Sequence, residues 1–418
     1  MLQAHLGCDA TDPFMNSHPA STRGALAAYD IGAVTDCVRD PATEAYRALR
    51  ARLEAEGMQY GSGSEAYYAA AGVRAACALV LALSCTLLTD AWPAHLLGAA
   101  LLGVFWQQLA FVGHDLGHNG VSGRRALDGA RGLLFGPALT GISFSWWKAT
   151  HNAHHVSTNS AEDDPDVQHM PLIAVSSHFF GSLWSSYHAK RMFFSSCTRA
   201  MVTRQHLFFY PLMFFARWNL YFQGVCSLAL GRRSLAAAAE VAALLFFYAW
   251  VGALVGAAGR GEAHLLPALA VRLAFLLTCN GVAGGLHVQI VLSHFSQPTR
   301  LGRAGQGGTS FLHDQLAGTM NITLPPALDF VFGGLQFQVE HHLFPRLPAH
   351  ALRALAPVVR ALAKEHGLPY KEASFWDANV QLYRTLRRVA KEAEALSGSD
   401  LDAAVLDHRL MDALLLRG

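Results

Sequence analysis

Seven histidines of this chain lie in three short clusters whose spacing is typical of metal ligands. The clusters are HDLGH at 114–118, HNAHH at 151–155 and QVEHH at 338–342. Positions i, i+3 and i+4 of a helix share a face, so each cluster can direct its side chains at one point. Imidazole binds zinc, copper, iron and nickel, and seven rings are more than one tetrahedral zinc ion uses. The simplest count is two metal ions.

Chance is the alternative explanation, because a chain with 21 histidines produces some clusters without any function. Three clusters that each adjoin a long apolar segment favour a site over chance. We predict all seven as catalytic metal ligands: His114, His118, His151, His154, His155, His341 and His342.

The elements that position these histidines are membrane helices. The chain is 52% hydrophobic and only 15% charged, against about 25% charged residues in ordinary soluble domains. Four segments are long and apolar enough to span a bilayer, at about 75–92, 94–113, 241–259 and 273–293. A fifth apolar stretch, 132–147, is interrupted by Gly136, Pro137 and Gly141, so we expect it to be re-entrant or interfacial.

Four spans place all three clusters on one side of the membrane, with the N-terminus, the segment from 114 to 240 and everything after residue 294. The segment from 114 to 240 is rich in Arg and Lys, whereas the two opposite turns carry only Arg260 and, at the edge of the fourth span, Arg272. By the positive-inside tendency, the histidine clusters face the cytosol. The net charge of +2 and the absence of a basic run give no indication of nucleic-acid binding. The seven cysteines have no CxxC spacing and are expected to be free thiols.

The motifs resemble those of the membrane fatty-acyl and sphingolipid desaturases. The matching stretches are HDLGHN, WWKATHNAHHVSTNSAEDDPDVQHMP and LQFQVEHHLFPRLP, and the resemblance covers about residues 44–373. Glutamine at position 338 resembles the front-end subgroup. The stretches DDPDVQHMPLIAVSSHFF and HVQIVLSHFSQP are most similar to Δ8 sphingolipid long-chain-base desaturases.

This resemblance implies an O2-dependent desaturase that uses two iron ions to introduce a double bond into a sphingolipid long-chain base. Electrons would come from cytochrome b5 and its NADH reductase, and the substrate would be a membrane lipid, in the endoplasmic reticulum. The alternatives are a front-end acyl-lipid fatty acid desaturase and a di-iron lipid hydroxylase, which shares the histidine plan. A seven-helix zinc hydrolase or receptor would need more spans, and a silent scaffold would tolerate loss of cluster residues.

Further ligands and supporting residues follow from the same comparison of motifs. His294 ends the fourth span and resembles the additional ligand that the family has outside the clusters. Carboxylates and amides next to ligands commonly accept imidazole N–H bonds and fix the ring orientation. We predict this supporting role for Asp115, Asn152, Asp164 and Gln338, and also for Asp163, Asp166 and Glu340.

The N-terminus resembles the second half of a fused cytochrome b5 domain, on the stretch GCDATDPFMNSHPASTRGALAAYDIGAV at 7–34. His18 lies where that family places its second haem ligand. The HPGG motif with the first ligand is not in this sequence, so haem binding by His18 would require a longer chain. The alternative is an exposed polar tail.

The expected fold is an all-α integral membrane protein with four transmembrane helices, a re-entrant or interfacial helix and a cytosolic helical cap that holds the di-iron histidine site. We divide it into a partial cytochrome b5-like remnant (1–40), a cytosolic linker or helix (41–74), a membrane desaturase domain (75–373) and a C-terminal helical tail (374–418). Within the domain, an amphipathic helix at 349–366 is expected to cap the metal site.

Overall fold

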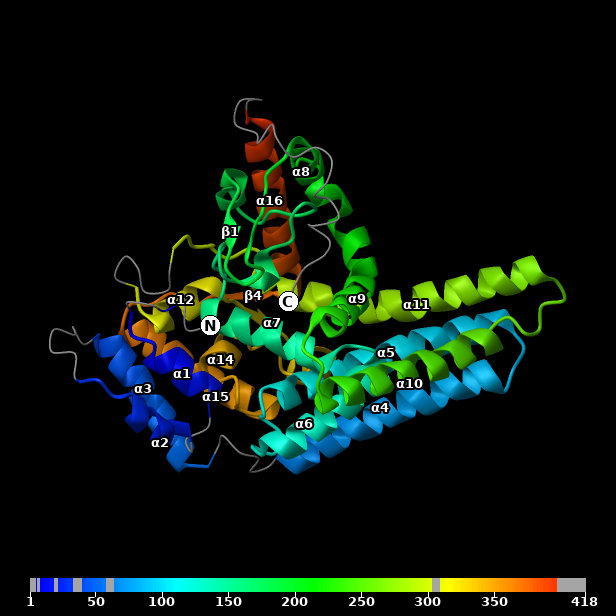
Figure 1. Cartoon of the computed structure of the whole chain (residues 1–418), viewed down its shortest axis with the longest axis horizontal. Helices are drawn as coiled ribbons and strands as arrows, with labels where there is room; N and C mark the ends of the chain where they lie inside the picture. The colour runs from blue at the N-terminus through cyan, green and yellow to red at the C-terminus, as the bar shows by residue number, and fades with distance from the viewer. Residues whose placement is uncertain are drawn as a thin grey trace.

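Four long helices form a bundle on one side of the molecule in this computed structural model (Figure 1). They are α4 (Ser64–Leu87), α5 (Trp92–Gly117), α10 (Leu235–Ala257) and α11 (Leu265–Val291). Each is long and apolar enough to cross a membrane, which confirms the four predicted spans. The structure describes residues 5, 8–18, 22–32, 40–57, 64–302 and 309–396.

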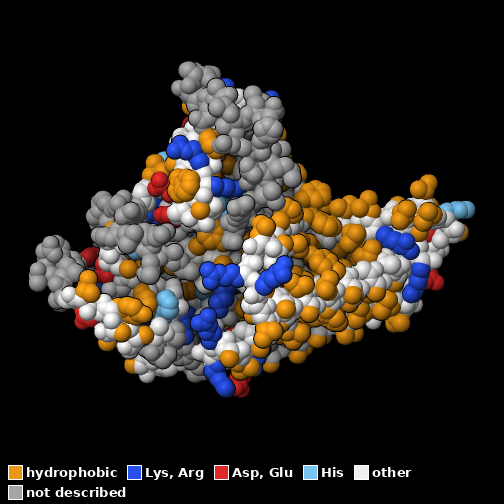
Figure 2. Space-filling model, in the orientation of Figure 1, with side chains coloured by type: hydrophobic (Ala, Val, Ile, Leu, Met, Phe, Trp, Pro, Cys, Tyr) orange, Lys and Arg blue, Asp and Glu red, His pale blue; other side chains and the backbone are white. Residues whose placement is uncertain are grey.

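The order of these helices puts their connections at opposite ends. Short turns join α4 to α5 and α10 to α11 at the far tip, where Arg260 Nε bonds Asp90 Oδ1 at 2.6 Å. Everything else lies at the other end, which we call the histidine side. The outer surface of the bundle is apolar, and charged side chains appear at the tip and on the histidine side (Figure 2). A surface of this kind suits lipid along the helices and water at both ends.

The histidine side is built from shorter elements. In the N-terminal part and after α5 these are α1 (Thr11–Ser17), α2 (Arg23–Leu26), η3 (Ala27–Tyr29), α3 (Pro41–Ala55), α6 (Arg125–Leu133), η4 (Leu134–Ala138), α7 (Phe144–Ser157), η5 (Pro165–Val167), η6 (Ser177–Gly181), α8 (Ser196–Val202) and α9 (Gln205–Leu230). After α11 come α12 (Phe311–Gly318), η7 (Pro326–Leu328), α13 (Asp329–Phe332), α14 (Gln338–Leu343), α15 (Ala349–Glu365) and α16 (Phe375–Glu394).

Strands are few among the described residues. β1 (Trp184–Ser185) pairs antiparallel with β2 (Lys190–Arg191), and β3 (Asn321–Thr323) pairs parallel with β4 (Glu372–Ser374). The all-α class is therefore confirmed apart from two short pairs. The β3–β4 pair ties the segment before α14 to the segment before α16, which brings the third histidine cluster against the C-terminal helices.

The fifth apolar stretch does not span. Residues 132–147 form the end of α6, the single π-turn η4, a loop and the start of α7. Gly141 in that loop has φ +74° and lies against the Phe247 ring. The expectation that this stretch is not a spanning helix is confirmed, and its re-entrant or interfacial placement stays a prediction. The sequence motifs predict no element over α9, whose exposed face carries Phe214, Trp218 and Phe222 and which lies across the end of the bundle (Figure 1).

The predicted cap is α15. Its Leu352, Leu355 and Val359 are buried against α3 and α14, in a core that also contains Tyr46. The C-terminal helical tail predicted at 374–418 begins with α16, which starts at Phe375, because Ser374 caps it by accepting from the Asp377 N–H. The predicted tail beyond residue 396 lies outside the described residues.

The predicted cytochrome b5-like remnant lies partly outside the described residues. Within them, α1 is held to α3 by ion pairs from Asp12 to Arg47 (2.8 Å) and Arg50 (2.7 Å). His18 follows α1, is exposed and stacks on Phe14 at 4.2 Å between ring centroids. Nothing in this arrangement tests haem binding, which stays a prediction.

Replacing Gly103 by alanine is expected to destabilise the bundle by about 1–3 kcal/mol, because a side chain there overpacks a close helix crossing. A Cβ at Gly103 would lie 2.6 Å from the Cys279 carbonyl oxygen and 2.8 Å from Val282 Cβ. Gly113 on the same helix has nothing within 4 Å of its Cβ position. Thermal unfolding in detergent should show a lower Tm for Gly103→Ala than for the control Gly113→Ala. Equal Tm values would contradict the crossing.

Candidate metal centre

The clustered histidines and His294 converge into two adjacent groups. One group contains His114, His118, His151, His155 and His341, and the other contains His154, His294 and His342. Within each group the candidate ligand atoms lie within 4.8 Å of one another. The structure thus brings together every residue that the sequence predicted as a metal ligand.

Neighbouring residues of one helix separate into different groups. On α7, His151 and His155 are four residues apart and share a face, whereas His154 is turned toward the other group. On α14, His341 joins the first group and His342 the second. The two groups are in contact, since the His155 and His342 rings stack at 4.3 Å. This division supports two ions side by side.

In the five-histidine group the Nε2 atoms face one another. His114 Nε2 lies 3.1 Å from His151 Nε2, His151 Nε2 lies 3.1 Å from His155 Nε2, and His155 Nε2 lies 3.0 Å from His341 Nε2. His114 donates its Nδ1–H to Asp115 Oδ1 at 3.1 Å, so Nε2 of the neutral ring carries a lone pair. Converging lone pairs repel unless a cation lies between them. Two nitrogens on one ion at about 2.1 Å would be about 3 Å apart.

In the three-histidine group the Nδ1 atom of each ring makes a hydrogen bond that fixes the orientation of the ring. His154 Nδ1 donates to Asp164 Oδ2 at 2.9 Å, His294 Nδ1 to the Gly318 carbonyl at 3.2 Å, and His342 Nδ1 to Gln315 Oε1 at 3.0 Å. The Nε2 atoms of His294 and His342 are buried and have no hydrogen-bond partner. A ligating histidine usually has its second nitrogen held in this way. The geometry of the group therefore fits a metal ion.

The electrostatics keep most of these rings neutral. Burial, followed by the charges of neighbouring histidines, lowers the pKa of His118, His155, His341 and His342 well below the ordinary value. Burial also lowers the pKa of His151 and of His294 to about 3. Only the neutral ring offers a lone pair to a metal. The site is accordingly ready to bind a cation without first releasing protons from these rings.

His154 differs from the other rings. Burial opposes its charge, but Asp164 and Asp166 outweigh burial and raise its pKa to about 9. Asp166 Oδ2 lies 3.9 Å from His154 Nδ1 and 3.9 Å from His151 Nδ1, so this carboxylate is beside one ring of each group. Together with Asp115 on His114, these carboxylates would balance part of the charge of bound cations.

The predicted supporting residues divide into those that reach a ring and those that do not. Asp115 and Asp164 accept from His114 and His154 as described, and Gln338 is near enough to the His294 ring to oppose the lowering of its pKa. Asn152 lines a cavity beside the histidines. Glu340 and Asp163 do not support a ring. Glu340 accepts from Asn321 and from Tyr370, both at 2.8 Å, and Asp163 bonds Ser160 and Ser186.

Several supporting residues were missed by sequence reasoning. Gln315 and the Gly318 carbonyl hold His342 and His294, although α12 shows no recognisable motif. Tyr68, on the first spanning helix, donates to Asp115 Oδ2 at 2.7 Å and thereby supports His114 indirectly. Asn321 is buried and its side chain donates to Glu340, which in turn lies beside two of the ligand histidines in the chain. All these contacts join residues far apart in sequence.

Comparison with known proteins gives a consistent result. The family model described as "Fatty acid desaturase" matches residues 90–374. The chain is 38% identical over 420 residues to Delta(8)-fatty-acid desaturase 2 of Arabidopsis thaliana, covering 99% of this chain and 88% of that protein. It is 37% identical to the acyl-lipid (9-3)-desaturase of Borago officinalis (95% and 86%) and 37% identical to the Delta 8-(E)-sphingolipid desaturase of Emericella nidulans (84% and 63%).

Proposed function

The chain belongs to the fatty acid desaturase family, and from that premise we propose that it is an O2-dependent desaturase that introduces a double bond at the Δ8 position of a sphingolipid long-chain base. The observation that carries the reaction type is the pair of adjacent histidine groups at the end of four apolar helices. The substrate class is supported by relatives named as Δ8 and sphingolipid desaturases.

We propose iron for both positions. The eight histidines of the two groups would hold two ions, with His154, His294 and His342 on one and the other five rings on the second. Two iron ions with dioxygen would supply the strong oxidant that an unactivated methylene requires. The chain holds the rings through Asp115, Asp164, Gln315 and the Gly318 carbonyl, and fixes which nitrogen of each ring faces inward.

The balanced reaction defines what must enter and leave. One –CH2–CH2– unit, one O2, two electrons and two protons give one –CH=CH– unit and two water molecules. The electrons come from a one-electron haem carrier of the cytochrome b5 type and its NADH reductase. Haem binding by His18 stays conditional on a first ligand in a longer chain, and no step of the proposed reaction depends on it.

The location follows from the distribution of charge. Arg and Lys are abundant in the segment between α5 and α10, whereas Arg260 lies at the opposite tip. We therefore place the histidine side in the cytosol and the protein in the endoplasmic reticulum membrane. We also keep the division into a 75–373 desaturase domain with flanking 1–40, 41–74 and 374–418 segments.

The test is expression in a yeast that supplies its own cytochrome b5, followed by mass spectrometry of sphingoid bases and fatty acids against an empty vector. The expected product is a sphingoid base with a new double bond at Δ8. A new double bond only in acyl chains would favour the alternative, a front-end acyl-lipid desaturase, for which the Borago relative argues. Hydroxylated lipids without a double bond would identify a hydroxylase and contradict the proposal.

A further inference from the structure

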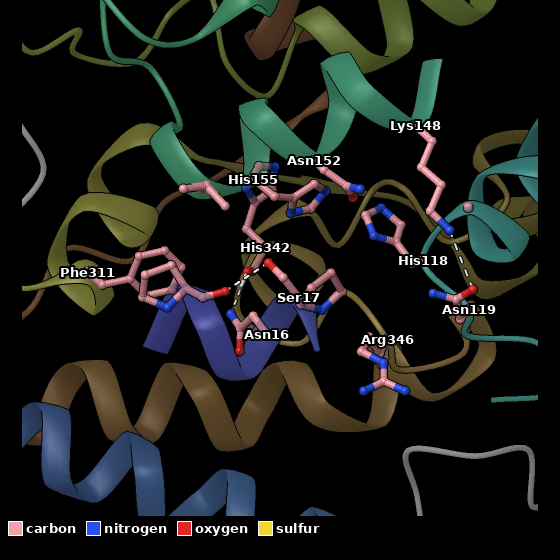
Figure 3. Close-up of a pocket in the computed structure, with 14 residues that line it drawn as sticks. Asn16, Ser17, His118, Asn119, Lys148, Asn152, His155, Phe311, His342 and Arg346 are labelled. Carbon is pink, nitrogen blue, oxygen red and sulfur yellow. Dashed lines mark hydrogen bonds between the residues drawn. The ribbon is translucent and has the colours of Figure 1, made fainter. Parts of the chain in front are cut away.

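A cavity opens on the histidine side directly beside the metal centre (Figure 3). Its floor includes His118 and His155 of the five-histidine group and His342 of the three-histidine group. Its remaining walls come from α1, from the end of α5, from α7 and from the segment after α14. The cavity therefore touches both groups at once from the side that faces water.

The volume and the lining of this cavity are suited to hold water. The space open to the centres of water molecules is about 40 Å³, and one water molecule needs about 10–15 Å³ of such space. Its lining has amide, hydroxyl and cationic side chains, among them Asn16, Ser17 and Asn152. These groups give ordered water the polar partners that it needs.

One lining residue outside the histidine groups is able to exchange protons. No aspartate or glutamate is among the lining residues of this cavity, and Arg346 stays protonated at all ordinary pH values. Lys148 remains. Its Nζ points to Asn119 Oδ1 at 3.5 Å, and Asn119 follows His118 in the chain (Figure 3). The ammonium group of this half-buried lysine thus lies beside the end of α5 that carries His118.

We propose that this cavity is the port through which protons reach the reaction and product water leaves, and that Lys148 passes the protons. The inference deepens the proposed function and rests on it, because two protons are consumed and two water molecules are formed for each double bond. Lys148 gives a proton to water inside the cavity and is reprotonated from the solvent at the mouth. The positive charge of Lys148 is therefore restored after each transfer.

The charges around Lys148 suit this role. Burial lowers its pKa, and so do Arg125 of α6 and Arg346, whereas Asp128 of α6 raises it. From α5 it faces His118, whose own pKa is lowered in part by Lys148. The ring of Phe144, one turn earlier on α7, lies 5.8 Å from Nζ. A lysine whose pKa is lowered toward the working pH transfers protons more readily than an exposed one.

Two substitutions distinguish proton transfer from positive charge. Lys148→Arg keeps the positive charge and the contact with Phe144 but cannot release a proton. Lys148→Met removes both the positive charge and the proton that can be released. We expect each to lower the double bonds formed per NADH oxidised roughly 10- to 100-fold, with hydrogen peroxide released instead of water. Lys364→Met, on the exposed end of α15, is the control and should behave as the unaltered chain. Iron content should be equal in all four proteins.

Chemical modification of the full-length Lys148→Cys variant tests the port independently of turnover. Both an aminoethyl and a trimethylammonioethyl methanethiosulfonate should label residue 148 from the aqueous side, as read by mass spectrometry of the peptide. Only the aminoethyl adduct carries a proton that it can release, so only that adduct should restore coupling. The unaltered chain, treated in parallel, controls for the native cysteines.

The outcomes separate the port from the proposed function. Absence of labelling at residue 148 would overturn the port whatever the reaction is. Full coupling in Lys148→Arg, or rescue by the quaternary adduct, would replace proton transfer by a role for charge alone. If the unaltered chain forms no double bond in any lipid, the proposed function fails and the proposed proton role of Lys148 fails with it, while labelling still reports whether the cavity admits water.

Discussion

The His341→Ala variant is expected to form no measurable double bond while it still reaches the membrane. His341 is buried, its Nε2 lies 3.0 Å from that of His155, and its ring centroid is 4.5 Å from that of His114. Loss of a residue that only supports a ligand commonly costs 10- to 100-fold in activity or metal affinity, so loss of a ligand should cost more than about 100-fold. The product is measured by mass spectrometry of yeast lipids.

The control for this experiment is His264→Ala. His264 is exposed at the start of α11, at the far tip of the bundle, and its removal should leave the product unchanged. Membrane insertion of both variants is checked by extraction at high pH, and iron is measured in the purified proteins. Normal product from His341→Ala, with normal iron content, would remove His341 from the metal site and with it the five-histidine group.

The two histidine groups differ in how many of their rings the cavity reaches. The five-histidine group is reached by the cavity through His118 and His155, whereas His154 and His294 of the second group do not line it. His342 of the second group lines the cavity as well, and Asp164 and Asp166 lie beside His154. The cavity thus reaches both groups, while His154, paired with two carboxylates, lies away from it. We therefore expect the two ions to differ in the number of histidines around them and in their access to water.

Much of the fold could be predicted from the sequence because it depends on local patterns of apolar residues. The four spans follow from runs of apolar residues, and α15 follows from Leu352, Leu355 and Val359 at helical spacing. The bounds shifted by several residues, since α4 and α11 begin before their most apolar part. Helix α9 was missed because its aromatic residues give no clear period and its 26 residues do not form a candidate span.

The ligand set was predicted from spacing, but its division into two groups was not. Sequence spacing shows that His151 and His155 share a helix face, yet it cannot show that His341 approaches them while its neighbour His342 turns to His294. That arrangement depends on how α14 packs against α7, with residues nearly two hundred positions apart. Glu340 illustrates the same limit. Its place beside two ligands suggested ring support, whereas its carboxylate is taken by Asn321 and Tyr370.

Asp164→Asn is expected to lower activity and iron affinity about 10- to 100-fold. The Asp164 side chain is fully buried, and Oδ2 accepts from His154 Nδ1 at 2.9 Å and from the Asn159 N–H at 2.7 Å, while Oδ1 accepts from the Asp166 N–H at 2.9 Å. An asparagine has one oxygen for three donors, so its NH2 group must face an N–H. Either His154 loses its orientation or the turn after α7 changes.

The neighbouring Asp163→Asn variant is a matched control for this effect. Asp163 bonds the hydroxyls of Ser160 and Ser186 and no imidazole, and a hydroxyl can donate to or accept from an amide. We expect its activity within about twofold of the unaltered chain, as surface substitutions of this kind are usually mild. Iron titration of the purified apoproteins, with product formation measured beside it, compares the two. Equal losses in both variants would show that the turn, and not the bond from Asp164 to His154, supports the second histidine group.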